Sequence, residues 1–108
     1  MTPAQIEQAA QLLKKARVEK SVIESIPLQI RPQTLKDAYA VQDRLVDILG
    51  LQTAGWFCAC TNEKIQQMLK LEEPYYARLF KDYLFAQPAV LESSDYPPIV
   101  IECEFGFT

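Results

Sequence analysis

The sequence predicts an α+β fold, with helices in the first half of the chain and short strands in the second. Three observations support this class. Apolar residues recur at helical spacing up to residue 49, β-branched and aromatic runs appear after residue 53, and no repeat, low-complexity segment or linker interrupts the 108 residues. We therefore expect residues 1–108 to form a single domain.

A helix is expected near the N-terminus. Thr2 and Gln5 have the spacing of a capping box, and Pro3 stands at the first helical position. The side chains that follow at helical spacing extend the helix to about Glu19; they are Ile6, Ala10, Leu13 and Arg17. Residues 21–33 then combine two prolines with several apolar residues, which indicates an irregular connection packed against the rest of the fold.

A second helix follows this connection. Thr34 is a suitable N-cap, and Gly50 supplies the usual C-terminal stop. One apolar face is formed by Ala38, Val41, Leu45 and Ile48, and it is widened by Tyr39, Val46 and Leu49. The sequence therefore predicts an amphipathic helix over residues 35–49.

Shorter elements are predicted after residue 50. The pattern changes from Thr53, residues 55–61 are typical of a short buried strand, and residues 81–86 and 89–91 also have strand character. Between them, Thr61 or Asn62 begins a third helix that ends before Pro74 and directs Ile65, Met68 and Leu69 inward. For residues 75–80 we expect a turn or a short helix.

The last twelve residues, 97–108, read as a final strand that carries two carboxylates. Glu102 and Glu104 would point to the same face of that strand, with Cα atoms about 6.6 Å apart. Two oxygen ligands in this arrangement suit a hard divalent cation. The alternative is a solvent-facing edge strand, on which acidic residues discourage aggregation.

Composition excludes several classes of function. A net charge of -3 and dispersed basic residues argue against binding to nucleic acid. No apolar run could span a bilayer and no signal peptide is evident, so we expect no membrane association and a cytoplasmic location. Because the chain has no histidine, any chemistry must rest on carboxylates, lysines, tyrosines or a metal.

Three cysteines are expected to be reduced, buried and structural; they are Cys58, Cys60 and Cys103. A thiolate metal or redox site built from them is an alternative, although their spacing lacks a paired CxxC motif. Tyr75 and Tyr76 could line a pocket or simply pack beside a turn. Gly55 and Trp56 indicate either a close backbone approach or a ligand site.

Four segments taken in order resemble one family. They are residues 35–43, 55–61, 73–80 and 102–104. Together they are similar to the 2-keto-4-pentenoate hydratases, which are grouped with the 2-oxo-3-enoate (4-oxalocrotonate) decarboxylases in the fumarylacetoacetate hydrolase superfamily. The resemblance covers nearly the whole chain but only the N-terminal portion of the family's longer sequence. It implies a truncated part of a fumarylacetoacetate-hydrolase-like fold.

The resemblance also implies a metal site and a substrate. Mg²⁺ or Mn²⁺ would be held by Glu102, Glu104 and a third acid further along the family sequence. The metal would chelate a small 2-keto acid and support hydration of a conjugated dienoic acid, as in the degradation of aromatic compounds. Candidates for the substrate pocket are Trp56, Phe57, Tyr75 and Tyr76. No catalytic residue is assigned by the resemblance.

Two departures from the family pattern suggest that the isolated chain is inactive. Phe57 stands where the family has a pocket lysine, and a phenyl ring cannot donate a proton. The sequence also ends before the third ligand and most of the active-site enclosure, so the expected partner is a complementing C-terminal half or a second copy. The competing hypothesis is a degenerate, non-catalytic module that associates with itself.

Overall fold

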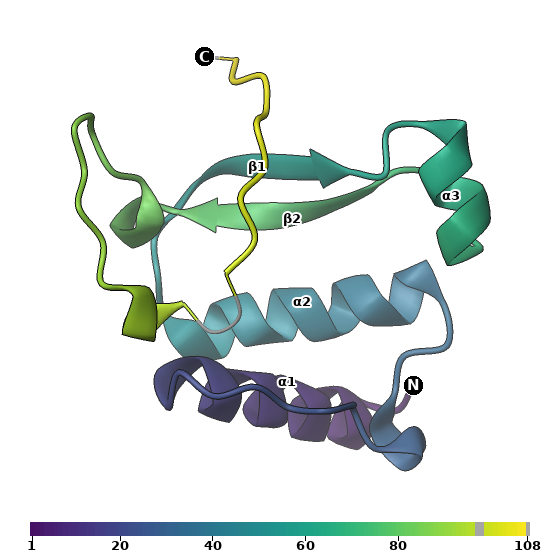
Figure 1. The fold of residues 1–108 in the computed structure, drawn as a ribbon. Coiled ribbons are helices and arrows are strands. Elements are labelled where there is room, and N and C mark those ends of the chain that lie inside the picture. Colours follow the sequence, from purple (N-terminus) through teal and green to yellow (C-terminus); the bar gives the residue numbers. More distant parts are fainter. Residues whose placement is uncertain (97–98, 108) are drawn as a thin grey trace.

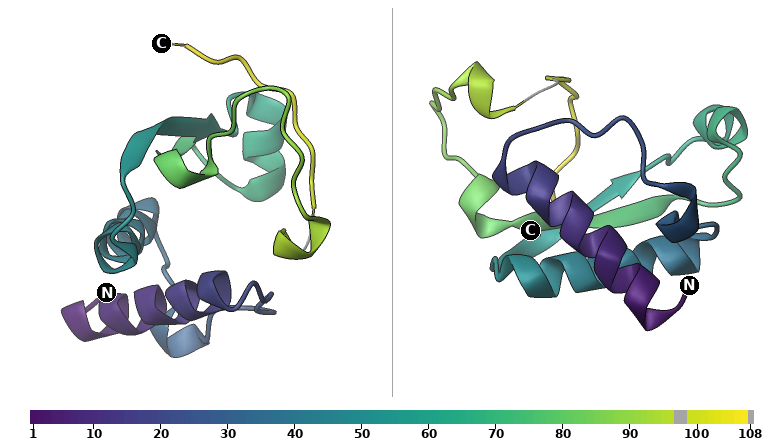
Figure 2. Two further views of the ribbon diagram at one scale, coloured as in Figure 1. Left: turned by 90° about the vertical axis from the view of Figure 1, so that its left-hand side faces the viewer. Right: turned by 90° about the horizontal axis from the view of Figure 1, so that it is seen from below.

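The structure is a computed structural model that describes residues 1–96 and 99–107. Helices α1 (Pro3–Val18) and α2 (Leu35–Leu49) pack against each other below a sheet of strands β1 (Thr53–Ala59) and β2 (Tyr75–Phe80) (Figure 1). Helix α3 (Glu63–Leu69) connects the two strands at one end of the sheet. Turning the molecule shows α1 crossing beneath α2, with residues 99–107 beside the sheet (Figure 2). The α+β class is confirmed.

Local signals in the sequence set the ends of α1. The Thr2 hydroxyl accepts a hydrogen bond from the Gln5 amide at 3.3 Å, and the Gln5 side chain accepts one from the Thr2 amide at 2.8 Å. This reciprocal pair satisfies two helix-end donors, which explains why the helix begins at Pro3. It ends at Val18 with Glu19 as its C-cap, so the predicted helix is confirmed.

Helix α2 is confirmed in the same way. The Thr34 hydroxyl accepts a hydrogen bond from the Asp37 amide at 3.1 Å. Gly50 adopts a left-handed conformation with φ of 65°, and its N–H donates a hydrogen bond to the carbonyl of Val46. A side chain at that φ would be strained, so glycine suits this stop.

The buried core lies where the two long helices cross. Its fully buried members include Ala9 and Ala10 of α1, whose small side chains allow α2 to approach. Val41 from α2 and Ile30 from a single turn of 3₁₀ helix (Leu28–Ile30) complete the cluster. The connection over residues 21–33 is therefore packed at Ile30, as expected, although Leu28 is exposed.

The sheet differs from the prediction in two respects. Residues 75–80 form strand β2 rather than a turn or helix, because they pair antiparallel with β1. Such pairing joins residues far apart in sequence, which local signals cannot reveal. Strand β1 is present as predicted, but its residues alternate between half-buried and exposed, so it is not a fully buried strand.

Helix α3 begins where Asn62 caps it, with the Ile65 amide donating to the Asn62 carboxamide at 3.0 Å. That part of the prediction is confirmed. Ile65 is half-buried, but the predicted inward placement is wrong for Met68, which is 68% exposed, and for Leu69, which is 50% exposed. No described element packs closely enough over Met68 and Leu69 to bury them.

The strands predicted after β2 are not formed in the described residues. Residues 81–83 make a 3₁₀ turn (Lys81–Tyr83), and residues 84–86 and 89–91 have no regular structure. The predicted final strand is also wrong for residues 99–107, while Pro97, Pro98 and Thr108 lie outside the described residues. Strand structure requires hydrogen bonds to a neighbouring strand, and no described segment pairs with residues 99–107.

None of the described helices is long and apolar enough to cross a membrane.

Candidate functional site

The four pocket candidates are divided between the two faces of the sheet. Trp56 is paired with Arg78 across the strands, and Cys58 is paired with Tyr76, so Trp56 and Tyr76 share one face. Phe57 and Tyr75 point to the opposite face. The structure therefore does not bring all four into one pocket.

The first face packs against α2 through aromatic rings. The rings of Tyr39 and Tyr76 are stacked with centroids 4.2 Å apart, and the rings of Trp56 and Tyr76 form a T-shaped pair with centroids 5.2 Å apart. The Arg78 guanidinium lies 4.1 Å from the centre of the Trp56 ring and donates to Asp43 at 3.1 Å. A cation over an indole face adds to the stability of this contact.

We call this group the helix–sheet cluster; its members are Tyr39, Gln42, Asp43, Trp56, Tyr76 and Arg78. Its Trp56 and Tyr76 rings line an open cavity of about 260 Å³. Trp56 stays 55% exposed. The contacts assign these two residues mainly to packing between α2 and the sheet, and three of the segments that carry the family resemblance meet here.

Sequence reasoning did not single out Tyr39, Gln42, Asp43 or Arg78 as members of a site. A signal for three of them was present, because Tyr39, Gln42 and Asp43 are spaced by three and four residues and so share one face of the helix. Arg78 gave no such signal, since its position depends on the pairing of β2 with β1.

The second face brings Tyr75 near Glu102, one of the two predicted metal ligands. Burial raises the pKa of the Tyr75 phenol above its usual value, and the neighbouring Cys60 and the negative charge of Glu102 raise it further. The phenol is therefore protonated at neutral pH and can donate a hydrogen bond. Residues 99–107 pass in front of the sheet in Figure 1.

Glu102 and Glu104 are both exposed and lie in a segment without strand structure. Their carboxylates are the right kind of donor for Mg²⁺ or Mn²⁺, which prefer oxygen ligands. Within residues 1–96 and 99–107, however, no three acidic or cysteine side chains lie close enough together to hold an ion. The described residues thus offer ligands of suitable chemistry but not a complete coordination shell.

The cysteines differ from their predicted state in exposure. All three are free, as expected, but Cys58 and Cys103 are exposed and Cys60 is half-buried, so a buried structural role is wrong for them. They also do not form a thiolate cluster among the described residues. Cys60 has a left-handed backbone with φ of 57°, and its carbonyl accepts a hydrogen bond from Gln66 at 2.7 Å.

Comparison with known proteins agrees with the resemblance seen in the sequence. The chain is 32% identical over 111 aligned residues to "2-keto-4-pentenoate hydratase" of Paraburkholderia xenovorans (strain LB400). The same identity relates it to "2-keto-4-pentenoate hydratase 3" of Pseudomonas putida. The chain resembles the 2-keto-4-pentenoate hydratases. No protein-family profile matches it.

The alignment covers different shares of this chain and of the two hydratases. The alignment includes 99% of this chain but 41% of each hydratase, so the chain spans about two fifths of the length of these relatives. That coverage is consistent with an N-terminal portion of a hydratase. It also means that all four segments with family character fall inside the aligned region.

Proposed function

We propose that the chain is the N-terminal part of a divalent-metal-dependent hydratase, a lyase that acts on small 2-keto or 2-hydroxydienoic acids. The observation that carries this proposal is the similarity to two hydratases over 99% of the chain. A cytoplasmic role in the breakdown of aromatic compounds, on a fumarylacetoacetate-hydrolase-like fold, is part of the same proposal.

In this proposal Glu102 and Glu104 hold Mg²⁺ or Mn²⁺ as oxygen ligands. The bound ion would polarise the 2-oxo group of the acid and fix its orientation. The charge of Glu102 contributes to the raised pKa of Tyr75, and in this proposal the protonated Tyr75 phenol would donate a hydrogen bond to the bound acid. Phe57, on the same face, would supply an apolar wall.

The division of the pocket candidates narrows the proposed substrate site. Trp56 and Tyr76 face α2 and pack with Tyr39, so we place the acid on the other face, beside Phe57 and Tyr75. Two carboxylates alone bind magnesium weakly, because that ion demands six ligands in octahedral geometry and releases its waters reluctantly. We therefore expect the isolated chain to be inactive and to need a complementing C-terminal half or a second copy.

Ligand-dependent thermal stability tests this function in the chain as it stands. Mg²⁺ or Mn²⁺ with pyruvate, the simplest 2-keto acid, should raise the melting temperature, because a ligand that binds the folded state stabilises it. Glu102→Gln should abolish the rise, whereas Glu92→Gln, an exposed acid of the same region, should keep it. A rise that survives Glu102→Gln, or no rise in the unaltered chain, would count against the function.

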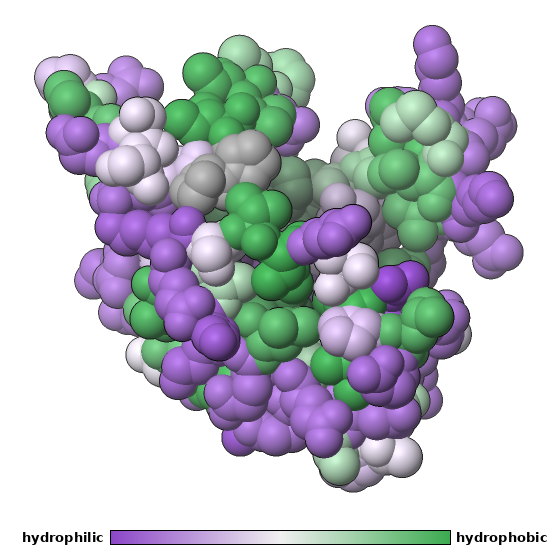
Figure 3. Space-filling view, turned by 60° about the horizontal axis from the view of Figure 1, so that its bottom comes forward, coloured by the Kyte–Doolittle hydropathy of each residue, from purple (hydrophilic) through white to green (hydrophobic). Residues whose placement is uncertain are grey.

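A non-catalytic module that associates with itself is the second candidate. It is favoured by apolar side chains that stand in solvent along residues 99–107, among them Ile101 at 88% and Phe105 at 93% exposure. Figure 3 shows that hydrophobic residues reach the surface between polar ones on the face it presents. Exposed apolar surface of this kind commonly marks an interaction site.

Sedimentation velocity over a wide concentration range separates the two candidates. The module hypothesis predicts a dimer or larger species whose mass falls when Ile101→Ser and Phe105→Ser are combined. A monomer at all concentrations would contradict it and leave the hydratase proposal as the better account.

A further inference from the structure

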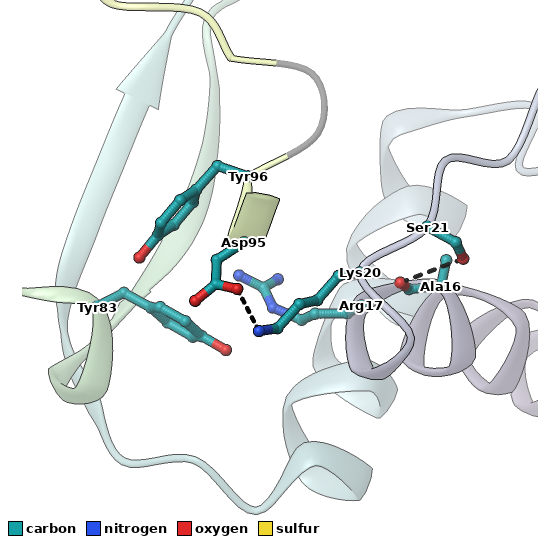
Figure 4. Close-up of a pocket in the computed structure, with 7 residues that line it drawn as sticks. All are labelled: Ala16, Arg17, Lys20, Ser21, Tyr83, Asp95 and Tyr96. Carbon is teal, nitrogen blue, oxygen red and sulfur yellow. Dashed lines mark hydrogen bonds and ion pairs between the residues drawn. The ribbon is translucent and has the colours of Figure 1, made fainter. Parts of the chain in front are cut away.

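A second hollow lies away from Glu102 and Glu104, at the C-terminal end of α1. It has a volume of about 450 Å³, within the range of small-molecule sites. Figure 4 shows the basic side chains of Arg17, from α1, and Lys20, just after α1, reaching it, and two phenol rings reaching it from the opposite wall. The lining residues are Ala16, Arg17, Lys20, Ser21, Tyr83, Asp95 and Tyr96.

Arg17 is held in this hollow by aromatic rings rather than by an acid. Its guanidinium lies 5.4 Å from the centre of the Phe80 ring and 5.1 Å from that of Tyr83. Phe80 is buried, so one of the two rings is fixed in the fold. Among residues 1–96 and 99–107 no carboxylate pairs with Arg17, and its N–H groups are free to meet a ligand.

Lys20 and Asp95 set the charge of the hollow. The Lys20 ammonium donates to the Asp95 carboxylate, which ties the end of α1 to the 3₁₀ turn Ser93–Asp95 (Figure 4). With Arg17 included, two positive charges face one negative charge. The remaining single positive charge matches a ligand with one negative charge, while Asp95 would repel a dianion.

We propose that this hollow binds a small organic monoanion, a carboxylate carried on a flat apolar body. The carboxylate would accept hydrogen bonds from the Arg17 fork, for which a planar two-oxygen acceptor is the best geometric match. The apolar body would lie against the rings of Tyr83 and Tyr96. This site shares no residue with the proposed metal site and does not depend on the proposed hydratase function.

Benzoate is the probe that tests the site, with binding followed by amide chemical shifts in two-dimensional NMR. Benzyl alcohol has the same ring without the charge, and inorganic phosphate, a mixture of monoanion and dianion near neutral pH, is an oxyanion without the ring. Saturable shifts near residues 16–21 and 83 are expected with benzoate, and markedly smaller ones with either control. Equal binding of benzyl alcohol, preferential binding of phosphate, or the absence of saturable shifts with benzoate would overturn the proposal.

Substitutions at Arg17 and Arg44 test whether Arg17 binds the carboxylate of benzoate. Arg17→Met keeps an unbranched apolar stem without the charge and should weaken benzoate binding by about tenfold or more, which is the loss of a charge-assisted hydrogen bond. Arg44→Met makes the same change in charge on α2, where Arg44 pairs with Glu7, and should leave the affinity within twofold. Arg17→Lys, which keeps the charge but loses the fork, should fall between them. Equal losses in Arg17→Met and Arg44→Met would show a general charge effect and contradict the site.

Discussion

The side-chain amide of Gln42 closes part of the outer edge of strand β2. Its Nε2 donates to the carbonyl of Tyr76 at 3.1 Å, and its Oε1 accepts from the N–H of Arg78 at 3.2 Å. A carbonyl and an N–H two residues apart on one strand point to the same edge, so one primary amide satisfies both. Helix α2 thereby takes the place of a third strand at this point of the sheet.

Replacing Gln42 tests this contact. Gln42→Met keeps the length of the side chain but leaves the two backbone groups of β2 without their partner, so the free energy of unfolding should fall by about 1–2 kcal/mol. Gln8→Met, at an exposed position of α1, should change it by less than about 0.5 kcal/mol. Urea denaturation measures both, and equal values for the two variants would contradict the role of Gln42.

The crossing of α1 and α2 depends on small side chains. Ala10 is fully buried between the helices, so Ala10→Leu would have to push them apart, and we expect a loss of about 1–3 kcal/mol in the free energy of unfolding. Ala4→Leu, at an exposed position of the same helix, is the matched control and should be nearly neutral. Thermal or urea unfolding of the two variants measures the difference. An Ala10→Leu variant as stable as Ala4→Leu would mean that the helices cross elsewhere.

Acid stability should depend on Asp37. The N-terminal ammonium donates a hydrogen bond to the Asp37 carboxylate at 2.8 Å. This contact lowers the pKa of Asp37 below its ordinary value of 3.8. Burial opposes the shift, and a hydrogen bond from the Thr34 hydroxyl adds to it. The unfolded chain therefore binds the proton more readily than the folded one. The stabilisation is present above the ordinary value and is lost as the pH falls through the lowered pKa.

Urea denaturation across the acid range tests this linkage. In Asp37→Asn the loss of unfolding free energy below about pH 4 should be smaller than in the unaltered chain. It should not vanish, since the Arg44 guanidinium also lowers the pKa of Glu7. Asp82→Asn, an exposed acid outside the ion pairs of the described residues, should retain the original acid slope. An unchanged slope in Asp37→Asn would refute the assignment.

The elements predicted well are those whose ends are set by local contacts. Thr2, Thr34, Asn62 and Gly50 each act on residues within one helical turn, so the boundaries of the helices could be inferred from the sequence. Residues 75–80 and 99–107 could not be inferred, because strand formation depends on a distant partner. The former has β1 as its partner, and the latter has none in the described residues.

The candidate site was predictable in chemistry but not in arrangement. The spacing of Glu102 and Glu104 indicates oxygen ligands, whereas the approach of Glu102 to Tyr75 joins positions 27 residues apart and follows from the path of the chain. The separation of Tyr75 from its sequence neighbour Tyr76 depends on β2 being a strand, and adjacent residues of a strand face opposite ways.

Binding of Mn²⁺ to the two glutamates tests the central proposal most directly. Electron paramagnetic resonance reports the free ion, so its signal should fall on addition of the chain and fall further when pyruvate is present. The double variant Glu102→Gln and Glu104→Gln should leave the signal at the level of free Mn²⁺, with or without pyruvate, while Glu92→Gln should behave like the unaltered chain. Equal binding of Mn²⁺ by the unaltered chain and the double variant would contradict the account.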